Sequence, residues 1–527
     1  MNDVSRVNQR PQLAAGDWLS AGARRFGDSP FLVGADGKTQ SYLETNSRVN
    51  RLAQAMIRKG LGKGSRVGIL ATDTPQHVEV VLACLKTGAI FCDLNYRLKA
   101  PELKRILGTA KCQAIFTESR YLPVLTDVFS VDSIVQIWTI GKQDLQDGAS
   151  IEILINETLE GSDFTALAVG EDIVSIAFTS GTTGIPKGVL QSERMIRNII
   201  YSGIREMNMR EGAFRYAGAP LFHISGIGSV LYSLASGGAI LILPQFDAAI
   251  VLEWLQDRGL TDCTLIPTMI SALLDLPTVM DSKYSNLRSI LYGGAPMTPA
   301  LLKRTISVFG CDLYNGFGAG TEAGGQTMLY PQDHVDALNG KEHLLGSIGK
   351  PIMGVDLRIC DNDLNELPRG QIGEIVTRSE TIMAGYLDQP ELTSFSILNG
   401  WFRAGDMARM DDEGYLFLTA RKADMIIRGG ENVYPFEIET TIAEHPAIAG
   451  VAVVGIPDAH WGEIVGAAIM LRPEATVDVD EIRDFCRQRL ASYKTPEVIR
   501  IFDHLPLNPT GKNDKQAIAE LMRQITI

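Results

Sequence analysis

The stretch Thr179-Ser180-Gly181-Thr182-Thr183-Gly184-Ile185-Pro186-Lys187-Gly188 gathers four hydroxyl side chains, three glycines and one lysine into ten residues. It follows the apolar run Ile173–Phe178, which predicts a buried strand. Glycines leave backbone N–H groups uncovered, so an anion can approach them, while the hydroxyls and Lys187 add donors and positive charge. The spacing matches neither the Walker P-loop nor the dinucleotide-binding turn. Two interpretations of the stretch by itself stay open: a flexible surface loop, or a cradle for a polyphosphate.

The length and charge of the chain narrow the classes of protein it can belong to. Its 527 residues exceed what one hydrophobic core organises, so we expect two or more domains. Hydrophobic residues make up 45% and charged residues 21%, which is typical of a soluble globular protein. The net charge of −13 provides no basic stripe and argues against a nucleic-acid partner. An anionic substrate therefore needs positive charge placed locally.

Cysteine usage and the apolar runs bear on the compartment. The seven cysteines are odd in number, form no C-x-x-C pair and mostly lie in apolar runs, which favours buried free thiols and a reducing, cytoplasmic location. The seven histidines show no metal-ligand spacing. The segment Ile224–Phe246 is uncharged, but its glycines favour a helix, a turn and the strand Ala239–Leu243 over a membrane span. We therefore expect no integral membrane segment.

Alternating strands and helices predict an α/β fold of mostly parallel layers. A capping box at Ser41-Tyr42-Leu43-Glu44 predicts a helix start, and Val78–Thr87 predicts a second helix ending at Gly88. Strands are expected at Arg66–Leu70, Ala89–Cys92, Ala114–Thr117, Tyr216–Pro220, Thr264–Pro267 and Ser289–Tyr292. Beyond Gly346, Val355–Asp361 and Ile372–Arg378 predict a β-rich subdomain.

The domain organisation is expected to have three parts. Residues 1–12 form a disordered tail, residues 13–420 a large N-terminal domain, and residues 421–527 a small mobile α+β domain. In the last part we expect strands at Met425–Arg428, Val451–Gly455 and Glu497–Phe502, with a helix over Val479–Leu490.

Further motifs follow the phosphate-loop candidate in order. They are Pro220-Leu221-Phe222-His223, Tyr292-Gly293-Gly294-Ala295-Pro296, Phe317-Gly318-Ala319-Gly320-Thr321-Glu322, Trp401-Phe402-Arg403-Ala404-Gly405-Asp406, Ala420-Arg421-Lys422-Ala423-Asp424, Arg428-Gly429-Gly430-Glu431-Asn432-Val433-Tyr434-Pro435 and Pro506-Leu507-Asn508-Pro509-Thr510-Gly511-Lys512. The ordered set resembles the adenylate-forming superfamily, which includes acyl-CoA synthetases, standalone adenylation domains and luciferases. The resemblance covers nearly the whole chain and is closest to fatty-acyl and crotonobetaine/carnitine-CoA ligases.

The resemblance implies a role for each motif. Lys512, Thr321, Glu322 and His223 would be the catalytic residues, with His223 beside the acyl pocket. Glu322 and Thr183 would hold Mg²⁺, whose preferred ligands are hard oxygens. The loop Gly429, Gly430 and Glu431 would bind CoA. ATP and AMP would be bound by Thr179, Ser180, Gly181, Thr182, Thr183, Gly184, Lys187, Gly293, Gly294, Ala295, Pro296, Asp406 and Arg421.

Three positions depart from the family pattern. Gly318 stands where an aromatic residue is usual, with Phe317 one place early, and Ala404 replaces a usual threonine. At the expected hinge between the domains, Ala423 stands where aspartate or lysine is usual. These departures affect adenine stacking and the polar contacts of the hinge.

The predicted reaction is ATP-dependent ligation of a carboxylic acid to CoA through an acyl-adenylate, with release of AMP and pyrophosphate. Mg²⁺ is the expected cofactor, with ATP and CoA as co-substrates. The segments expected around the acyl pocket are rich in glycine, alanine and serine and hold no basic residue, which favours an apolar or aromatic acid over one with a second carboxylate. Open alternatives are an enzyme that loads a carrier protein and an inactive homologue that acts as a binding protein. A homodimer is one assembly left open.

Overall fold

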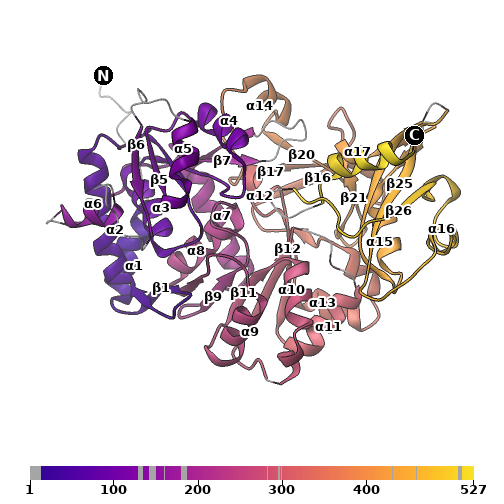
Figure 1. The fold of residues 1–527 in the computed structure, drawn as a ribbon, viewed down its shortest axis with the longest axis horizontal. Helices are drawn as coiled ribbons and strands as arrows, with labels where there is room; N and C mark the ends of the chain where they lie inside the picture. The colour runs from indigo at the N-terminus through magenta and orange to yellow at the C-terminus, as the bar shows by residue number, and fades with distance from the viewer. Residues whose placement is uncertain are drawn as a thin grey trace.

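The computed structural model describes residues 13–128, 135–141, 150–158, 161–179, 187–281, 283–294, 297, 299–429, 431–458, 460–508 and 513–526. The tail predicted for residues 1–12 lies outside this set. The described strands form four sheets, here called A to D in the chain order of their first strands. Sheets C and D are the smaller two. Sheet D, coloured orange to yellow, lies at one end of the molecule, and helices α1, α2 and α6 lie at the other (Figure 1). The expected α/β fold, with a large first part and a small last part, is confirmed.

Sheet A has nine strands in the order β15-β14-β13-β12-β11-β9-β10-β1-β2, with a parallel centre from β13 to β1. Its strands are β1 (Pro30–Gly34), β2 (Thr39–Ser41), β9 (Phe214–Ala217), β10 (Ala239–Ile242), β11 (Asp262–Leu265), β12 (Ser289–Gly293), β13 (Asp312–Phe317), β14 (Thr327–Leu329) and β15 (Lys350–Pro351). Strand β1 pairs with β10, about two hundred residues later, so the N-terminal segment completes a sheet built mainly from the middle of the chain.

Sheet B has seven strands in the order β18-β8-β7-β4-β3-β5-β6, with parallel pairing from β7 to β6. Its strands are β3 (Arg66–Leu70), β4 (Ile90–Asp93), β5 (Ala114–Thr117), β6 (Gln136–Thr139), β7 (Ile173–Thr179), β8 (Lys187–Ser192) and β18 (Gly385–Tyr386). Because parallel strands end at the same edge, the loops that follow β3, β4 and β7 gather there. This edge carries the phosphate-loop candidate.

Helices bury the faces of sheets A and B. Helix α3 (Pro75–Thr87) is buried on every side from His77 onward, and it contacts β1 of sheet A as well as β3 and β4 of sheet B. It therefore lies between the two sheets, which share one core. The other helices of this part are α1 (Trp18–Phe26), α2 (Tyr42–Arg58), α4 (Ala100–Ala110), α5 (Leu122–Val128), α6 (Ile151–Asn156), α7 (Glu193–Glu206), α8 (Ile224–Ser236), α9 (Ala248–Asp257), α10 (Pro267–Leu274), α11 (Pro299–Phe309), α12 (Gly320–Ala323), α13 (Pro331–Leu338) and α14 (Pro390–Ser396).

Two smaller sheets complete the chain. Sheet C is antiparallel and is the predicted β-rich subdomain, made of β16 (Asp356–Cys360), β17 (Ile372–Arg378), β19 (Ile397–Leu398), β20 (Trp401–Met410) and β21 (Leu416–Arg421). Sheet D contains β22 (Ile426–Arg428), β23 (Glu431–Val433), β24 (Ile448–Asp458), β25 (Gly462–Leu471) and β26 (Val498–Ile501). Helices α15 (Pro435–Ala443) and α16 (Val479–Arg487) cover one face of sheet D, and α17 (Lys515–Thr526) covers the other.

Several local predictions can be compared with these bounds. The capping box is confirmed: Ser41 accepts from the Glu44 amide, and the Glu44 carboxylate accepts from the Ser41 amide. The uncharged segment after His223 folds as helix α8 followed by strand β10, as expected. In the described ranges, no helix combines the length and the apolar character needed to cross a bilayer. The boundary proposed between residues 420 and 421 stays a prediction.

Candidate active site

The two ends of the phosphate-loop candidate lie directly opposite each other. Strands β7 and β8 pair antiparallel, and their last matched residues are Thr179 and Lys187. The intervening candidates Ser180, Gly181, Thr182, Thr183 and Gly184 lie outside the described residues. The prediction that a strand leads into this loop is confirmed, since β7 covers Ile173–Thr179. Thr179 and Lys187 thus lie at the edge of sheet B where the parallel strands end.

The one-turn helix α12 carries Thr321 and Glu322, and its carbonyl groups are held by donors from distant segments. The Gln191 side chain at the end of β8 donates to the Thr321 carbonyl at 2.8 Å. The Met383 amide donates to the Glu322 carbonyl at 2.8 Å, and the Thr381 hydroxyl donates to the Ala323 carbonyl at 2.7 Å. The position of Glu322 is therefore set by β8 and by the segment that follows β17.

The backbone explains why Gly318 replaces an aromatic residue. A Cβ atom at Gly318 would lie 2.1 Å from the Gly324 carbonyl oxygen, because the Gln326 amide donates to the Phe317 carbonyl and closes the turn tightly. No side chain fits at this position. Phe317 packs instead against the sheet C core around Ile348 and Leu357. The sequence left open whether Phe317 stacks on adenine, and the packing against this core gives the ring a structural role.

Charged groups converge on Glu322. Burial raises the pKa of the Glu322 carboxyl above its ordinary value, Asp406 adds to the rise, and Arg421 and Lys187 oppose it. Three predicted site residues from β8, β20 and β21 therefore act on one carboxylate. A further group, Tyr386 on β18, lies under Lys187, whose ammonium is 5.5 Å from the ring centroid. Burial raises the pKa of Tyr386, and the Glu322 carboxylate raises it further.

Asp406 is a buried strand residue and not an exposed turn residue. It lies in β20, opposite Arg421 of β21, and the Arg421 Nε is 3.2 Å from the Asp406 Oδ1. The Arg421 side chain is 61% exposed, so the guanidinium can leave the pair to contact a ligand. Both residues predicted to bind the ribose or the phosphates therefore lie together.

The residues next to Arg421 anchor the predicted hinge. Lys422 extends back to the β-rich subdomain, where its Nζ lies 3.0 Å from the Glu374 Oε2. Arg403 contacts the same carboxylate oxygen at 2.5 Å. Burial alone would raise the pKa of Glu374, but Arg403 and Lys422 hold it below its ordinary value. On the other side of Ala423, Asp424 lies 3.8 Å from Lys515 of α17.

The adenine and acyl candidates lie on neighbouring elements. Gly293 ends β12 beside Gly316 of β13, and a Cβ atom on Gly293 would lie 2.3 Å from the Gly316 carbonyl oxygen. Gly294 follows with a φ of +75°, so the chain turns where only glycine is unstrained. The next two candidates, Ala295 and Pro296, lie outside the described residues.

His223 caps helix α8, and its Nδ1 accepts from the Ser225 amide at 3.2 Å. The next residue, Ile224, lies against Gly320 of α12: a Cβ atom on Gly320 would be 3.2 Å from the Ile224 side chain. The structure therefore brings the His223 segment to the helix that carries Thr321 and Glu322.

The CoA candidates occupy a separate place in the fold. Gly429 and Glu431 flank the β22–β23 turn of sheet D, where the Gly429 amide donates to the Trp461 carbonyl at 2.7 Å and Glu431 is exposed. Gly430 and the catalytic candidate Lys512 lie outside the described residues. Their predicted roles stay predictions.

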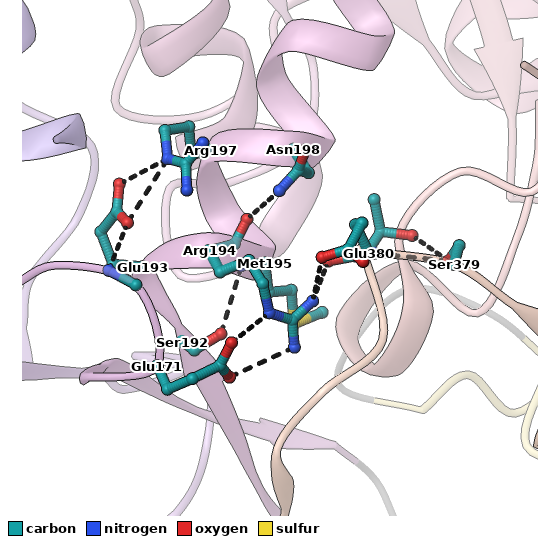
Figure 2. A network of polar contacts seen from close by, with 11 residues as sticks. Glu171, Ser192, Glu193, Arg194, Met195, Arg197, Asn198, Ser379 and Glu380 are labelled. Carbon is teal, nitrogen blue, oxygen red and sulfur yellow. Dashed lines mark hydrogen bonds and ion pairs between the residues drawn. The ribbon is translucent and has the colours of Figure 1, made fainter. Parts of the chain in front are cut away.

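Figure 2 shows a network that holds the segment after β17 and that the sequence did not indicate. Arg194, near the start of α7, lies between two carboxylates from distant segments: its Nε is 2.6 Å from Glu171 and its Nη1 is 3.3 Å from Glu380. Arg194 also donates to the Glu380 carbonyl. Because Thr381 and Met383 follow directly and bind α12, this network supports the position of Glu322. Arg194 and Glu380 are 186 residues apart, so no local pattern could have shown their contact.

Comparison with known proteins agrees with this geometry. A family model described as AMP-binding enzyme matches residues 19–387, and one described as AMP-binding enzyme C-terminal domain matches residues 437–512. The long-chain-fatty-acid–CoA ligase FadD13 of Mycobacterium tuberculosis is 31% identical, over 91% of this chain and 92% of its own. A feruloyl-CoA synthase from Amycolatopsis sp. is also 31% identical, over 90% and 92%.

Solved structures show the same fold. The amide bond synthetase McbA from Marinactinospora thermotolerans is 28% identical with a TM-score of 0.86, covering 96% of this chain and 99% of its own. A fatty acyl CoA synthetase of Mycobacterium tuberculosis is 29% identical with a TM-score of 0.77, covering 97% and 99%. Fold and site together define an adenylate-forming ligase. The chain belongs to the AMP-binding enzyme family, and within it to the AMP-forming acyl-CoA synthetases.

Proposed function

We propose that this enzyme converts a carboxylic acid, ATP and CoA into an acyl-CoA thioester, AMP and pyrophosphate by way of an acyl-adenylate. The observation that carries the proposal is the convergence of Lys187, Asp406 and Arg421 on the half-buried carboxylate of Glu322. Two cations and two carboxylates at the end of a parallel sheet suit a nucleotide, which needs positive charge for its phosphates and acceptors for its ribose hydroxyls.

The chemistry explains why these groups are needed. A carboxylate is a poor electrophile, so it first attacks the α-phosphate of ATP, and pyrophosphate leaves. This attack brings together the negatively charged oxygens of the substrate carboxylate and of the α-phosphate, so the enzyme must place positive charge near them. Lys512 would lie between the substrate carboxylate and the α-phosphate, while Lys187 and the hydroxyls of Thr182 and Thr183 would bind the leaving pyrophosphate. In the second step the CoA thiol attacks the activated carbonyl and AMP leaves.

Magnesium is the cofactor we propose, with Glu322 and Thr183 as its protein ligands. Mg²⁺ prefers oxygen ligands and is held at phosphate sites by about one or two carboxylates, with substrate oxygens and water completing the shell. A single half-buried carboxylate such as Glu322 therefore suits an ion shared with ATP. The ion would neutralise charge on the phosphates.

The substrate we propose is an acid with a long apolar or an aromatic body. The relatives reported above act on long-chain fatty acids and on ferulate, and a relative from Aromatoleum aromaticum, 30% identical, is an indoleacetate–CoA ligase. The residues at the His223 end of the site, Phe222 and Ile224, are apolar. A second substrate carboxylate would lack a counter-charge among the segments predicted to line the pocket.

The first experiment identifies the product. The enzyme is incubated with ATP, Mg²⁺, CoA and a panel of fatty, aromatic and dicarboxylic acids, and acyl-CoA products are measured by mass spectrometry. We expect thioesters from fatty or aromatic monocarboxylic acids. The relative ScoC of Streptomyces coeruleorubidus is a fatty acid–[acyl-carrier-protein] ligase at 31% identity. Acyl-adenylate without thioester would therefore favour carrier loading, and no ATP–pyrophosphate exchange with any acid would favour an inactive binding protein.

A second experiment separates the two half-reactions. We expect Lys512→Ala to abolish ATP–pyrophosphate exchange but to keep thioester formation from supplied acyl-adenylate, since only the first step brings two anions together. Lys283→Ala, which removes an exposed lysine in the loop before β12, is the control and should keep both activities. Equal loss of both steps in Lys512→Ala would contradict the assigned role.

We also propose a cytoplasmic location, supported by the state of the cysteines. All seven are free, and six of them are buried. A homodimer remains a prediction, tested by light scattering on the purified enzyme.

A further inference from the structure

A buried carboxylate that none of the motifs includes lies under the His223 turn. Asp73 is in the loop after β3, is 9% exposed, and accepts from the Leu221 amide at 3.0 Å. Leu221 belongs to the turn Pro220–His223, which is closed by the His223 amide donating to the Pro220 carbonyl at 2.9 Å. A residue from a loop of sheet B thus accepts a hydrogen bond from a turn that follows β9 of sheet A.

A buried polar pair acts electrostatically on the Asp73 carboxylate. His77 on α3 is fully buried, and its Nε2 is 2.9 Å from Oδ2 of Asp93, at the end of β4. The other ring nitrogen faces the Thr72 carbonyl at 3.3 Å. Because both nitrogens face acceptors, the ring suits a doubly protonated histidine, whose charge offsets the carboxylates of Asp73 and Asp93. Burial alone would lower the pKa of His77, but Asp93 and Asp73 raise it.

The loop after β4 supports the same turn from the other side. Tyr96 lies edge-on to Phe222 with 5.4 Å between ring centroids, and Arg97 lies 5.8 Å from the Phe222 ring centroid. Asp73, Leu221 and Gly226 also line a small cavity of about 10 Å³.

We propose that Asp73 is a positioning residue for the acid-binding side of the site, fixing the Pro220–His223 turn through the Leu221 amide. The proposal rests on the proposed function, since it gives the turn the task of placing His223 beside the substrate acid. Asp73 touches no reacting atom; it acts through Leu221. The bond is charge-assisted only while the carboxylate is ionised.

Because Asp73 can ionise, the strength of its hydrogen bond with the Leu221 amide depends on pH. Burial raises the pKa of Asp73 to about 7, and Asp93 adds to the rise. His77, the Leu221 amide and Arg97 oppose it. Tyr96 and Tyr216 also face the carboxylate, from the β4 loop and from β9. As the pH falls through this value, Asp73 takes up a proton and the bond weakens, so the KM for the acid should rise.

The test compares Asp73→Ala with Asp73→Asn, which keeps an acceptor for the Leu221 amide but does not titrate. With dodecanoate and ferulate as probes, we expect Asp73→Ala to raise the KM for the acid about tenfold by loss of a charge-assisted bond, with the KM for ATP unchanged. Asp73→Asn, which offers only a neutral acceptor, should give a KM between those of wild type and Asp73→Ala, equal to that of wild type below neutrality, and should lose its dependence on pH near neutrality. The control is Asp262→Asn, which removes a carboxylate from the first residue of β11, whereas the Pro220–His223 turn follows the last residue of the neighbouring parallel strand β9.

Hydrogen exchange gives a second readout that needs no substrate. Peptides covering residues 218–227 should exchange faster in Asp73→Ala than in wild type, and Asp73→Asn, with its neutral acceptor, should restore part of the protection. If Asp73→Ala matches Asp262→Asn in exchange over this turn, or raises the KM for ATP as much as that for the acid, the proposal is wrong. If no acid supports activity but the turn loosens only in Asp73→Ala, the proposed function fails while the positioning contact stands.

Discussion

Replacing Gly318 by alanine should move the helix that carries Glu322. The new Cβ atom would lie 2.1 Å from the Gly324 carbonyl oxygen, and real Cβ contacts essentially never fall below 3.0 Å, so the backbone must shift by at least the difference of about 0.9 Å. Overpacking of this size costs about 1–3 kcal/mol. Moving a catalytic group by about 1 Å from the reacting atoms lowers rates about 100-fold. We therefore expect a kcat/KM about 100-fold below that of wild type.

The assay is ATP–pyrophosphate exchange with a saturating acid, measured together with the midpoint of thermal unfolding. Gly325→Ala is the matched control, because a Cβ atom at Gly325 meets nothing within 4 Å and the residue lies in the same turn. We expect Gly325→Ala to resemble wild type. Equal activity of the two variants would refute the argument that the closed turn sets the position of Glu322.

Three further predictions concern buried polar groups. Because burial raises the pKa of Glu322, its ionised form destabilises the fold above that pKa. Glu322→Gln should therefore raise the midpoint of thermal unfolding at pH 8, measured by calorimetry. At a pH below the ordinary carboxyl range, the two proteins should unfold at the same temperature. Thr381→Val removes one of two donors to the Ala323 carbonyl, which keeps the Gln326 side chain as the other. The variant should lower the free energy of unfolding in urea by about 0.5–1.5 kcal/mol, whereas Thr381→Ser should not. Arg403 lowers the pKa of Glu374 in the folded protein. The ion pair therefore stabilises the fold above the pKa that Glu374 has in the unfolded chain, and this stabilisation is lost as the pH falls through the pKa of the folded state. Arg403→Met should lower the free energy of unfolding in urea by about 3 kcal/mol at pH 7 and by much less in acid.

The sequence predicted elements best where local chemistry determines them. Strands at Ala114–Thr117 and Ile372–Arg378 have the predicted bounds, because apolar runs between turn residues leave few alternatives. The helix that starts after Ser41 begins where the capping box places it. Other bounds shift by a few residues: β24 runs from Ile448 to Asp458, since pairing with β25 extends the predicted strand at both ends.

What the sequence did not indicate depends on pairing between distant segments. Tyr386 reaches Lys187 only because the two-residue strand β18 pairs with β8, and a strand of that length has no period to detect. The contact from Asp73 to Leu221 joins loops of two different sheets. By contrast, Asp406 and Arg421 were predicted by motif, and their adjacency follows from the β20–β21 ladder. Motifs indicated the chemistry, and topology determined which groups meet.

The pairing of β1 with β10 has a consequence for synthesis of the chain on the ribosome. Residues 30–34 have their parallel neighbour at residues 239–242, so the first strand emerges well before the strand it must join. At about 5–20 residues per second, translation of the intervening stretch takes about 10–40 seconds. During that time an apolar edge is open to other nascent chains. We expect chaperone dependence during translation to be greatest before residue 242 leaves the exit tunnel.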